Sequence, residues 1–152
     1  MHKLFIKLAF IVLLFQGNLF SQNTPTKIID EFFERYEKEG ITIALDSLYA
    51  TNKWVTNSPG LVIQLKSKIK MALGNEDFIG EMHGYEPISV KTLGSSFKLY
   101  SYLVKYDRQP IRFTFKFYKP QDDWILYTFK YDFNIPEEIE EAAKLYYEIN
   151  GY

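Results

Sequence analysis

The chain has 152 residues, with 18 basic against 19 acidic side chains, and 47% of its residues are hydrophobic. This balance excludes the strongly basic composition that binding to nucleic acid or to an anionic membrane surface favours. The chain has no cysteine, which excludes disulfides and the lipid-modified cysteine of a bacterial lipoprotein, so the 13 Phe and 12 Tyr must supply a dense core.

The first 21 residues have the order of regions that is typical of a secretory signal peptide. Lys3 and Lys7 give a positive start, an apolar run from Leu8 to Phe15 follows, and Ser21 is a small residue for cleavage. The apolar run falls far short of the ~20 residues that a membrane span needs. We therefore expect residues 1–21 to be removed, and residues 22–152 to form a single domain exported to the periplasm or the extracellular space.

The first part of the exported chain has the apolar spacing of helices. Thr24-Pro25 predicts the start of a helix and Gly40 predicts its end, with apolar residues at three- and four-residue spacing between them. A second, shorter helix is predicted from Ile41 to residues 49–52. A third is predicted from Ser58-Pro59 to Gly74.

Beyond these helices the sequence changes to runs rich in aromatic and β-branched residues, which favour strands. Short connections containing turn residues separate the runs, so the strands are expected to be antiparallel neighbours in a meander. The predicted strands are Tyr85–Leu93, Phe97–Tyr106, Ile111–Lys119 and Trp124–Phe133, and a last helix runs from Pro136 to about Glu148. The predicted fold class is α+β: N-terminal helices packed on a curved antiparallel four-stranded meander, plus a C-terminal helix.

The turn at residues 107–110 predicts which side chains share a face of the sheet. It sets Tyr106 opposite Ile111 and produces a continuous aromatic face, expected to pack on the helices, that carries Tyr100, Tyr102, Val104, Phe113, Phe115 and Phe117. A bulge or an odd-length loop near Asp122-Asp123 would keep four more residues on that face: Ile125, Tyr127, Phe129 and Tyr131. The reverse face is mixed and is a candidate partner surface, including one for a homodimer through the sheet; it carries Leu99, Leu103, Trp124 and Leu126.

This order of elements, with an aromatic meander that curls around the first helix, resembles the cystatin-like cone superfamily, which includes nuclear transport factor 2 and ketosteroid isomerase. The resemblance spans Pro25 to Phe133. Within it, the run His83-Gly84-Tyr85-Glu86 and the run from Leu99 to Pro110 look like small exported bacterial proteins of this fold with no assigned activity. The resemblance implies a pocket between sheet and helices. It implies no particular reaction, because the catalytic acids of the family's enzymes do not map onto this chain.

His83 is the only histidine after the leader, and Glu81, Tyr85 and Glu86 are near enough in sequence to orient it as a general base. The alternative interpretation is a surface histidine just before the first strand. One histidine and no cysteine do not supply a zinc site, and the acidic clusters lack the spacing of a calcium loop. Gly-x-Ser-x-Gly and glycine-rich phosphate motifs are absent from the sequence. We therefore predict no catalytic residue, no metal site and no cofactor.

The sequence thus favours an exported, non-catalytic binding module, and it leaves two kinds of partner open. One is a small apolar ligand in the cone pocket, and the other is a protein on the sheet. For a ligand in the pocket, the candidate binding residues are His83, Tyr85 and Glu86, where the chain passes from the helices into the sheet. The alternative function is a small pocket enzyme, isomerase- or hydrolase-like, that uses a Tyr/His/carboxylate constellation.

Overall fold

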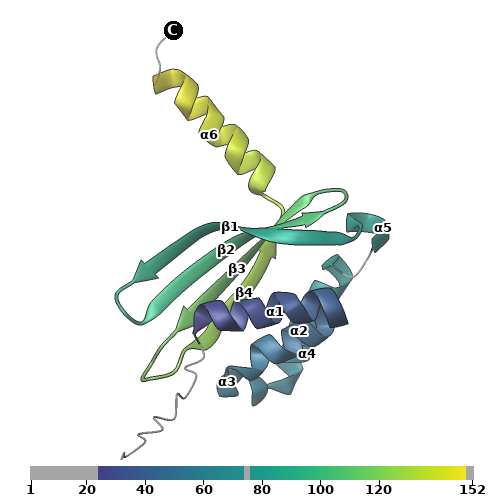
Figure 1. Cartoon of the computed structure of the whole chain (residues 1–152), viewed down its shortest axis with the longest axis vertical. Helices are drawn as coiled ribbons and strands as arrows, with labels where there is room; N and C mark the ends of the chain where they lie inside the picture. Colours follow the sequence, from purple (N-terminus) through teal and green to yellow (C-terminus); the bar gives the residue numbers. More distant parts are fainter. Residues whose placement is uncertain (1–23, 74–75, 150–152) are drawn as a thin grey trace, which may run out of the picture.

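The computed structural model describes residues 24–73 and 76–149, and it confirms the predicted α+β class (Figure 1). The predicted leader at residues 1–21 lies outside the described residues. The helices that precede the sheet are α1 (Pro25–Glu39), α2 (Ile41–Ala50), α3 (Lys53–Thr56), α4 (Pro59–Leu73) and α5 (Glu76–Ile79). The strands are β1 (Met82–Leu93), β2 (Phe97–Tyr106), β3 (Pro110–Tyr118) and β4 (Ile125–Asp132), and α6 (Ile135–Ile149) follows them.

Helix α1 begins and ends where its sequence predicts. The hydroxyl of Thr24 accepts a hydrogen bond from the Lys27 backbone N–H at 3.3 Å and caps the first turn. At the other end, Gly40 has a φ of +87°, which lets the chain turn directly from α1 into α2. The apolar stripe of α1 is buried against the sheet and consists of Ile28, Ile29, Phe32 and Phe33.

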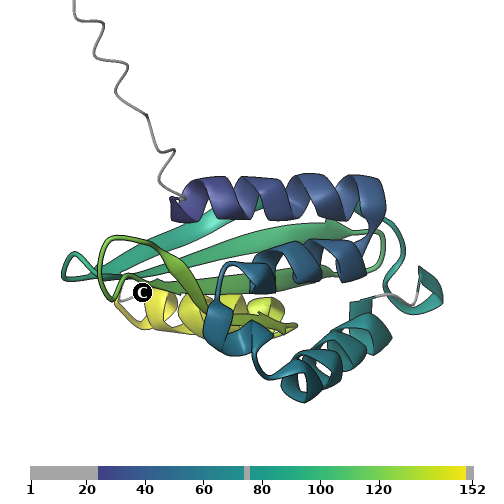
Figure 2. The same ribbon diagram turned by 90° about the horizontal axis from the view of Figure 1, so that it is seen from below.

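The helices α1 to α4 lie on one side of the sheet (Figure 2). Helix α4 packs against α2 and α3. Asn52 caps the short helix α3, which the sequence did not predict, and its carboxamide oxygen accepts a hydrogen bond from the Trp54 N–H at 3.0 Å. The Asn52 amide nitrogen also donates to the Leu126 carbonyl at 2.7 Å, and Asn52 is only 7% exposed. This side chain therefore fastens the junction of α2 and α3 to β4, an outer strand of the sheet.

The four strands form a simple antiparallel meander in the order β1-β2-β3-β4. The predicted pairing of Tyr106 with Ile111 is wrong by two residues, because Val104 lies opposite Ile111. The end of β2 extends beyond β3 and pairs with the start of β1. Tyr106 pairs with Met82, and the Asp107 N–H donates to the Glu81 carbonyl at 3.2 Å. A slip of two residues keeps every side chain on its own face. The predicted aromatic face therefore survives the error.

The prediction for β4 is wrong at its start. A register shift in the β3–β4 pairing makes Tyr127 an extra residue, since Leu126 pairs with Phe117 and Thr128 pairs with Lys116. Leu126 consequently joins the aromatic face at 1% exposure, while Tyr127 is 61% exposed. Ile125 pairs with Tyr118 on the reverse face, so the bulge lies within the strand and not at Asp122-Asp123.

Aromatic rings fill the space between α1 and the sheet. The ring centroid of Phe32 lies 5.2 Å from that of Phe115 and 5.6 Å from that of Phe129. Phe113, Phe115 and Phe117 each have 0% exposure, and they share one hydrophobic cluster with the buried face of α1. The middle of the fold is therefore packed core, and the hollow described below lies at its end.

Candidate functional site

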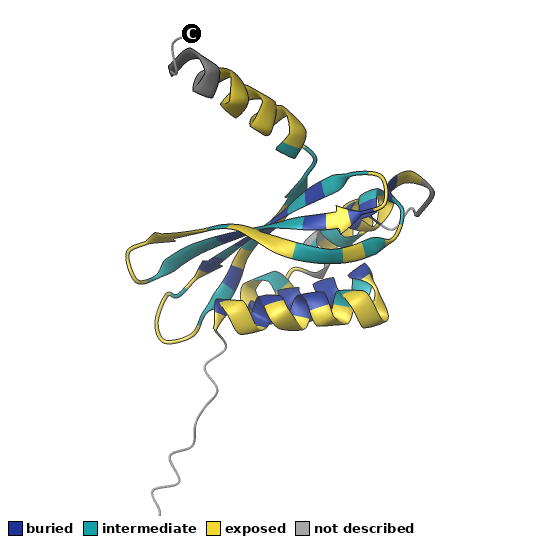
Figure 3. Ribbon diagram, turned by 45° about the horizontal axis from the view of Figure 1, so that its top comes forward, coloured by how far each residue is buried: buried dark blue, intermediate teal, exposed yellow. Residues whose placement is uncertain are grey.

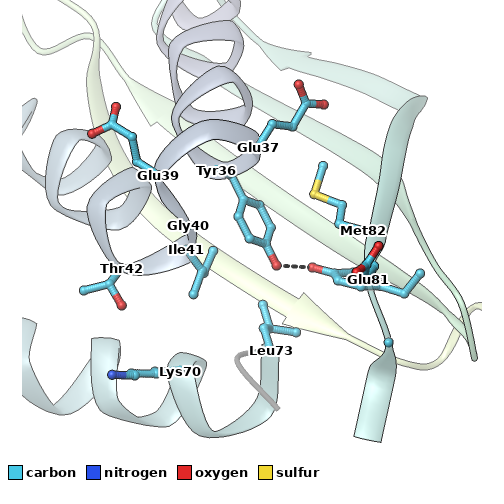
Figure 4. A pocket seen from close by; sticks show the side chains of 12 residues that line it. Tyr36, Glu37, Glu39, Gly40, Ile41, Thr42, Lys70, Leu73, Glu81 and Met82 are labelled. Carbon is cyan, nitrogen blue, oxygen red and sulfur yellow. Dashed lines mark hydrogen bonds between the residues drawn. The ribbon is translucent and has the colours of Figure 1, made fainter. Parts of the chain in front are cut away.

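A hollow of about 510 Å³ lies where α1 ends and where β1 begins (Figure 4). Its apolar lining includes Ile41 from α2, Leu73 from α4 and Met82 from β1. Tyr36, from the last turns of α1, and Tyr106, the last residue of β2, supply its phenol groups, and Thr42 adds an aliphatic hydroxyl. Five elements thus meet at this end of the molecule, and the hollow is the space that they leave.

The two tyrosines form a hydrogen-bonded pair, with 2.5 Å between their hydroxyl oxygens (dashed in Figure 4). Tyr106 is only 8% exposed and Tyr36 is half-buried. Burial raises the pKa of both phenols, so both are neutral at physiological pH. A pair of phenols carries two hydroxyl protons and the mutual bond uses one, so the other proton and the remaining lone pairs are free for a ligand.

Charged side chains surround the hollow. Three of them are acidic, Glu37, Glu39 and Glu81, and one is basic, Lys70. Glu39 also contacts Arg35, with 3.3 Å between Oε1 and Nη1. The carboxylates of Glu37 and Glu39 point away from the phenol pair (Figure 4). The rim therefore carries a negative excess, while the floor is neutral.

The approach of β1 to this site depends on Asp107, just beyond β2. Its Oδ2 accepts a hydrogen bond from the Glu81 backbone N–H at 2.7 Å, and its Oδ1 lies 2.5 Å from Nε2 of His83. These hydrogen bonds, the one from His83 first, hold the pKa of Asp107 below its usual value. Gly80, with a φ of +80°, passes so close to Asp107 that a Cβ at this position would overlap its side chain. Asp107 therefore positions Glu81 and Met82 beside the hollow.

The structure does not bring the three predicted binding residues together. Tyr85 faces the helices, and its ring stacks on Phe33 with 3.6 Å between centroids. His83 is exposed and bonds to Asp107, while Glu86 is exposed and pairs with Lys105, with 2.9 Å from Oε1 to Nζ. None of the three lines the hollow. A role for them in ligand binding stays a prediction.

The sequence reasoning missed the phenol pair. The sequence pattern places Tyr36 in the apolar spacing of the first helix and Tyr106 on the aromatic face of the second strand, and it assigns neither a binding role. A local signal was present, because each is a tyrosine at the polar end of an otherwise apolar stripe. Their meeting is not visible in the sequence, since 70 residues separate them.

A second hollow, of about 470 Å³, lies between the α2–α3 junction and the β3–β4 connection. It includes Trp54, which is 81% exposed, and Trp124. The ammonium groups of Lys98 and Lys119 lie 5.1 and 5.5 Å from the Trp124 ring centroid. Asn52, its buried polar side chain, already makes two hydrogen bonds that the fold uses. This hollow therefore offers fewer available buried polar groups than the first.

Within the described ranges, 24–73 and 76–149, no group of three or more His, Asp or Glu side chains is arranged to hold a metal ion. In the same residues no helix combines the length and the apolar character needed to cross a membrane. Comparisons of the chain with protein-family models, with curated proteins and with solved structures found no match. The resemblance to the cystatin-like cone stays a prediction, and function is inferred from geometry alone.

Proposed function

We propose that this protein is an exported, non-catalytic binding module that holds a small molecule in the hollow at the end of α1. The observation that carries the proposal is the Tyr36–Tyr106 pair, a neutral hydrogen-bonding group set beside an apolar wall. Ligand sites commonly combine such a wall with a few fixed polar groups. Export rests on the leader-like pattern of residues 1–21.

The lining indicates the chemistry of the ligand. Ile41, Leu73 and Met82 suit an apolar body, and the phenols suit one hydrogen-bonding group. The negative excess at the rim favours a cation over an anion, because an unlike charge is attracted and a like charge is repelled. A small amine with an apolar body therefore fits this hollow better than a carboxylate of the same size.

The phenol pair supports binding in preference to catalysis. A tyrosine that acts as a base or a nucleophile needs a lowered pKa, whereas burial raises the pKa of Tyr36 and Tyr106. His83 bonds to Asp107 outside the hollow, so it is not placed to exchange a proton with the pair. The groups inside can hold and orient a ligand, but they are poorly suited to remove its protons.

The proposal is tested by mass spectrometry of small molecules released from the protein purified from its native host. Binding is then measured by calorimetry for n-alkylamines, alkanols and carboxylates of equal chain length. We expect the amines to bind best. Tyr36→Phe and Tyr106→Phe each remove one hydroxyl and should weaken binding about 2- to 10-fold, the usual value of one hydrogen bond.

Tyr118→Phe is the matched control, because Tyr118 is 41% exposed and lies on the other face of the sheet. It should leave binding unchanged. If the Tyr36 and Tyr106 variants bind as tightly as the unaltered protein, the phenols do not form the site. If the native protein carries no small molecule and binds none of the three series, the hollow is not a ligand site.

A further inference from the structure

Helix α6 leaves the sheet on the side opposite to α1–α4 and points away from it (Figure 1). All its described side chains from Pro136 to Lys144 are exposed (Figure 3), including Ile139 at 64%. Ile135, Ile139 and Ala142 lie on one side of the helix, because they are four and three residues apart. A single helix of this length is only marginally stable in water, so an amphipathic one gains stability from a surface that covers its apolar side.

The face of the sheet that turns away from α1–α4, here called the outer face, is also uncovered in the described chain. Leu99 and Leu103 are half-buried on it, and around them lie five cations: Lys91, Lys105, Arg112, Lys116 and Lys130. Lys105 pairs with Glu86, and Arg112 pairs with Asp132 at 3.0 Å. Lys91, Lys116 and Lys130 form no ion pair with any described residue. The outer face is therefore basic with an apolar centre.

Helix α6 has the opposite charge. Between Ile135 and Lys144 it carries four acids, Glu137, Glu138, Glu140 and Glu141, against the single base Lys144. Glu138 binds Arg112 through two hydrogen bonds of 2.6 and 2.7 Å, and Glu141 pairs with Lys144. Glu137 and Glu140 form no ion pair with any residue that the structure describes. The helix and the outer face thus carry opposite charge, and each has apolar side chains among its charged ones.

We propose that α6 of one copy of this chain docks on the outer face of a second copy, and that the reciprocal contact completes a twofold dimer. Ile139 then lies against Leu99 and Leu103, and the acids of α6 face the unpaired lysines. The chain's own α6 does not cover its own outer face, because it points away and the Arg112–Glu138 pair holds its first turn in that direction. The α6 of a second copy can cover the outer face, so no other protein is needed as a partner.

The dimensions agree with this arrangement. Helix α6 has 15 residues and a length of about 22 Å, while strands of 8 to 12 residues give the sheet a length of about 27–40 Å. In a twofold dimer the helix–sheet contact occurs twice. Each contact needs to bury only about 600–1,000 Å², half of what a specific dimer buries in total. The hollow at the end of α1 opens on the other side of the sheet and stays accessible.

The test is sedimentation velocity of the protein as its host produces it. We expect a dimer. Ile139→Glu should raise its dissociation constant about tenfold or more, because a charge replaces an apolar contact. Ile63→Glu is the matched control, since Ile63 on α4 is 66% exposed and lies away from the outer face. Neither substitution should change the melting temperature of the monomer, because both side chains are exposed in it.

Charge exchange identifies the two surfaces. Lys116→Glu with Lys130→Glu should weaken the dimer about as much, and adding Glu137→Lys with Glu140→Lys should restore it. Lys68→Glu, an exposed lysine on α4, should have no effect. A monomer at every concentration, including one whose α6 folds back on its own sheet, overturns the proposal. So does a dimer that Ile139→Glu leaves intact, or one that the reversed charges fail to restore.

Discussion

Phe115 is the residue on which the packing of this fold can be tested most sharply. It has 0% exposure in the middle of β3, and its ring lies between α1 and the neighbouring strands. The centroid distances are 5.2 Å to Phe32, 5.9 Å to Phe33 and 5.1 Å to Phe129. Phe115→Ala removes these three ring contacts and a fourth, to Tyr102 at 6.0 Å, and leaves a void that neighbouring large rings cannot easily fill.

Replacing a buried phenylalanine by alanine usually costs about 3–5 kcal/mol. The upper half of this range is expected here, because each aromatic pair adds about 0.5–1.5 kcal/mol beyond area burial. The total free energy of unfolding of a domain of this size is about 5–15 kcal/mol, and the chain has no disulfide to limit the loss.

The assay is urea denaturation followed by circular dichroism. Tyr118→Ala, three residues along the same strand and 41% exposed, is the control and should cost less than about 1.5 kcal/mol. If Phe115→Ala costs no more than Tyr118→Ala, the inner face of the sheet is assigned wrongly.

Two further predictions concern pH and processing. Burial raises the pKa of Tyr49 from 10.0 to about 12, so this tyrosine ionises at a lower pH in the unfolded chain than in the folded one. Its contribution to the free energy of unfolding is complete below pH ~10. About 3 kcal/mol of that free energy is lost as the pH rises towards 12. Urea unfolding between pH 9 and 12 should show this fall. Tyr49→Phe should make the fall shallower without abolishing it, because burial also raises the pKa of Tyr36 and Tyr106. An equally steep fall in the variant would contradict the assignment to Tyr49. The exported protein should begin near Gln22, which N-terminal sequencing checks, and detection of residues 1–21 on protein recovered outside the cytoplasm would exclude cleavage.

The candidate site shows where sequence reasoning stops. His83, Tyr85 and Glu86 are adjacent in the sequence, yet β1 sends Tyr85 towards Phe33 and leaves Glu86 on the outer face with Lys105. Successive side chains of a strand point to opposite faces of the sheet, so residues that are next to each other in the sequence can lie on different faces. Tyr36 and Tyr106 show the converse, because α1 and β2 bring their hydroxyls to 2.5 Å across 70 residues. Only packing could create that pair.

By itself, the sequence determined the longer helices α1, α2, α4 and α6, the four strands, and the members of the aromatic face on β2 and β3. These depend on local periodicity, which tolerates the two-residue error of pairing Tyr106, in place of Val104, with Ile111. The tertiary structure decided the rest. Burial of Leu126 required a bulge at Tyr127, and β1 took the end of β2 for its own pairing. The direction of α6 follows from Arg112, which binds Glu138 across 26 residues, a contact that no local pattern specifies.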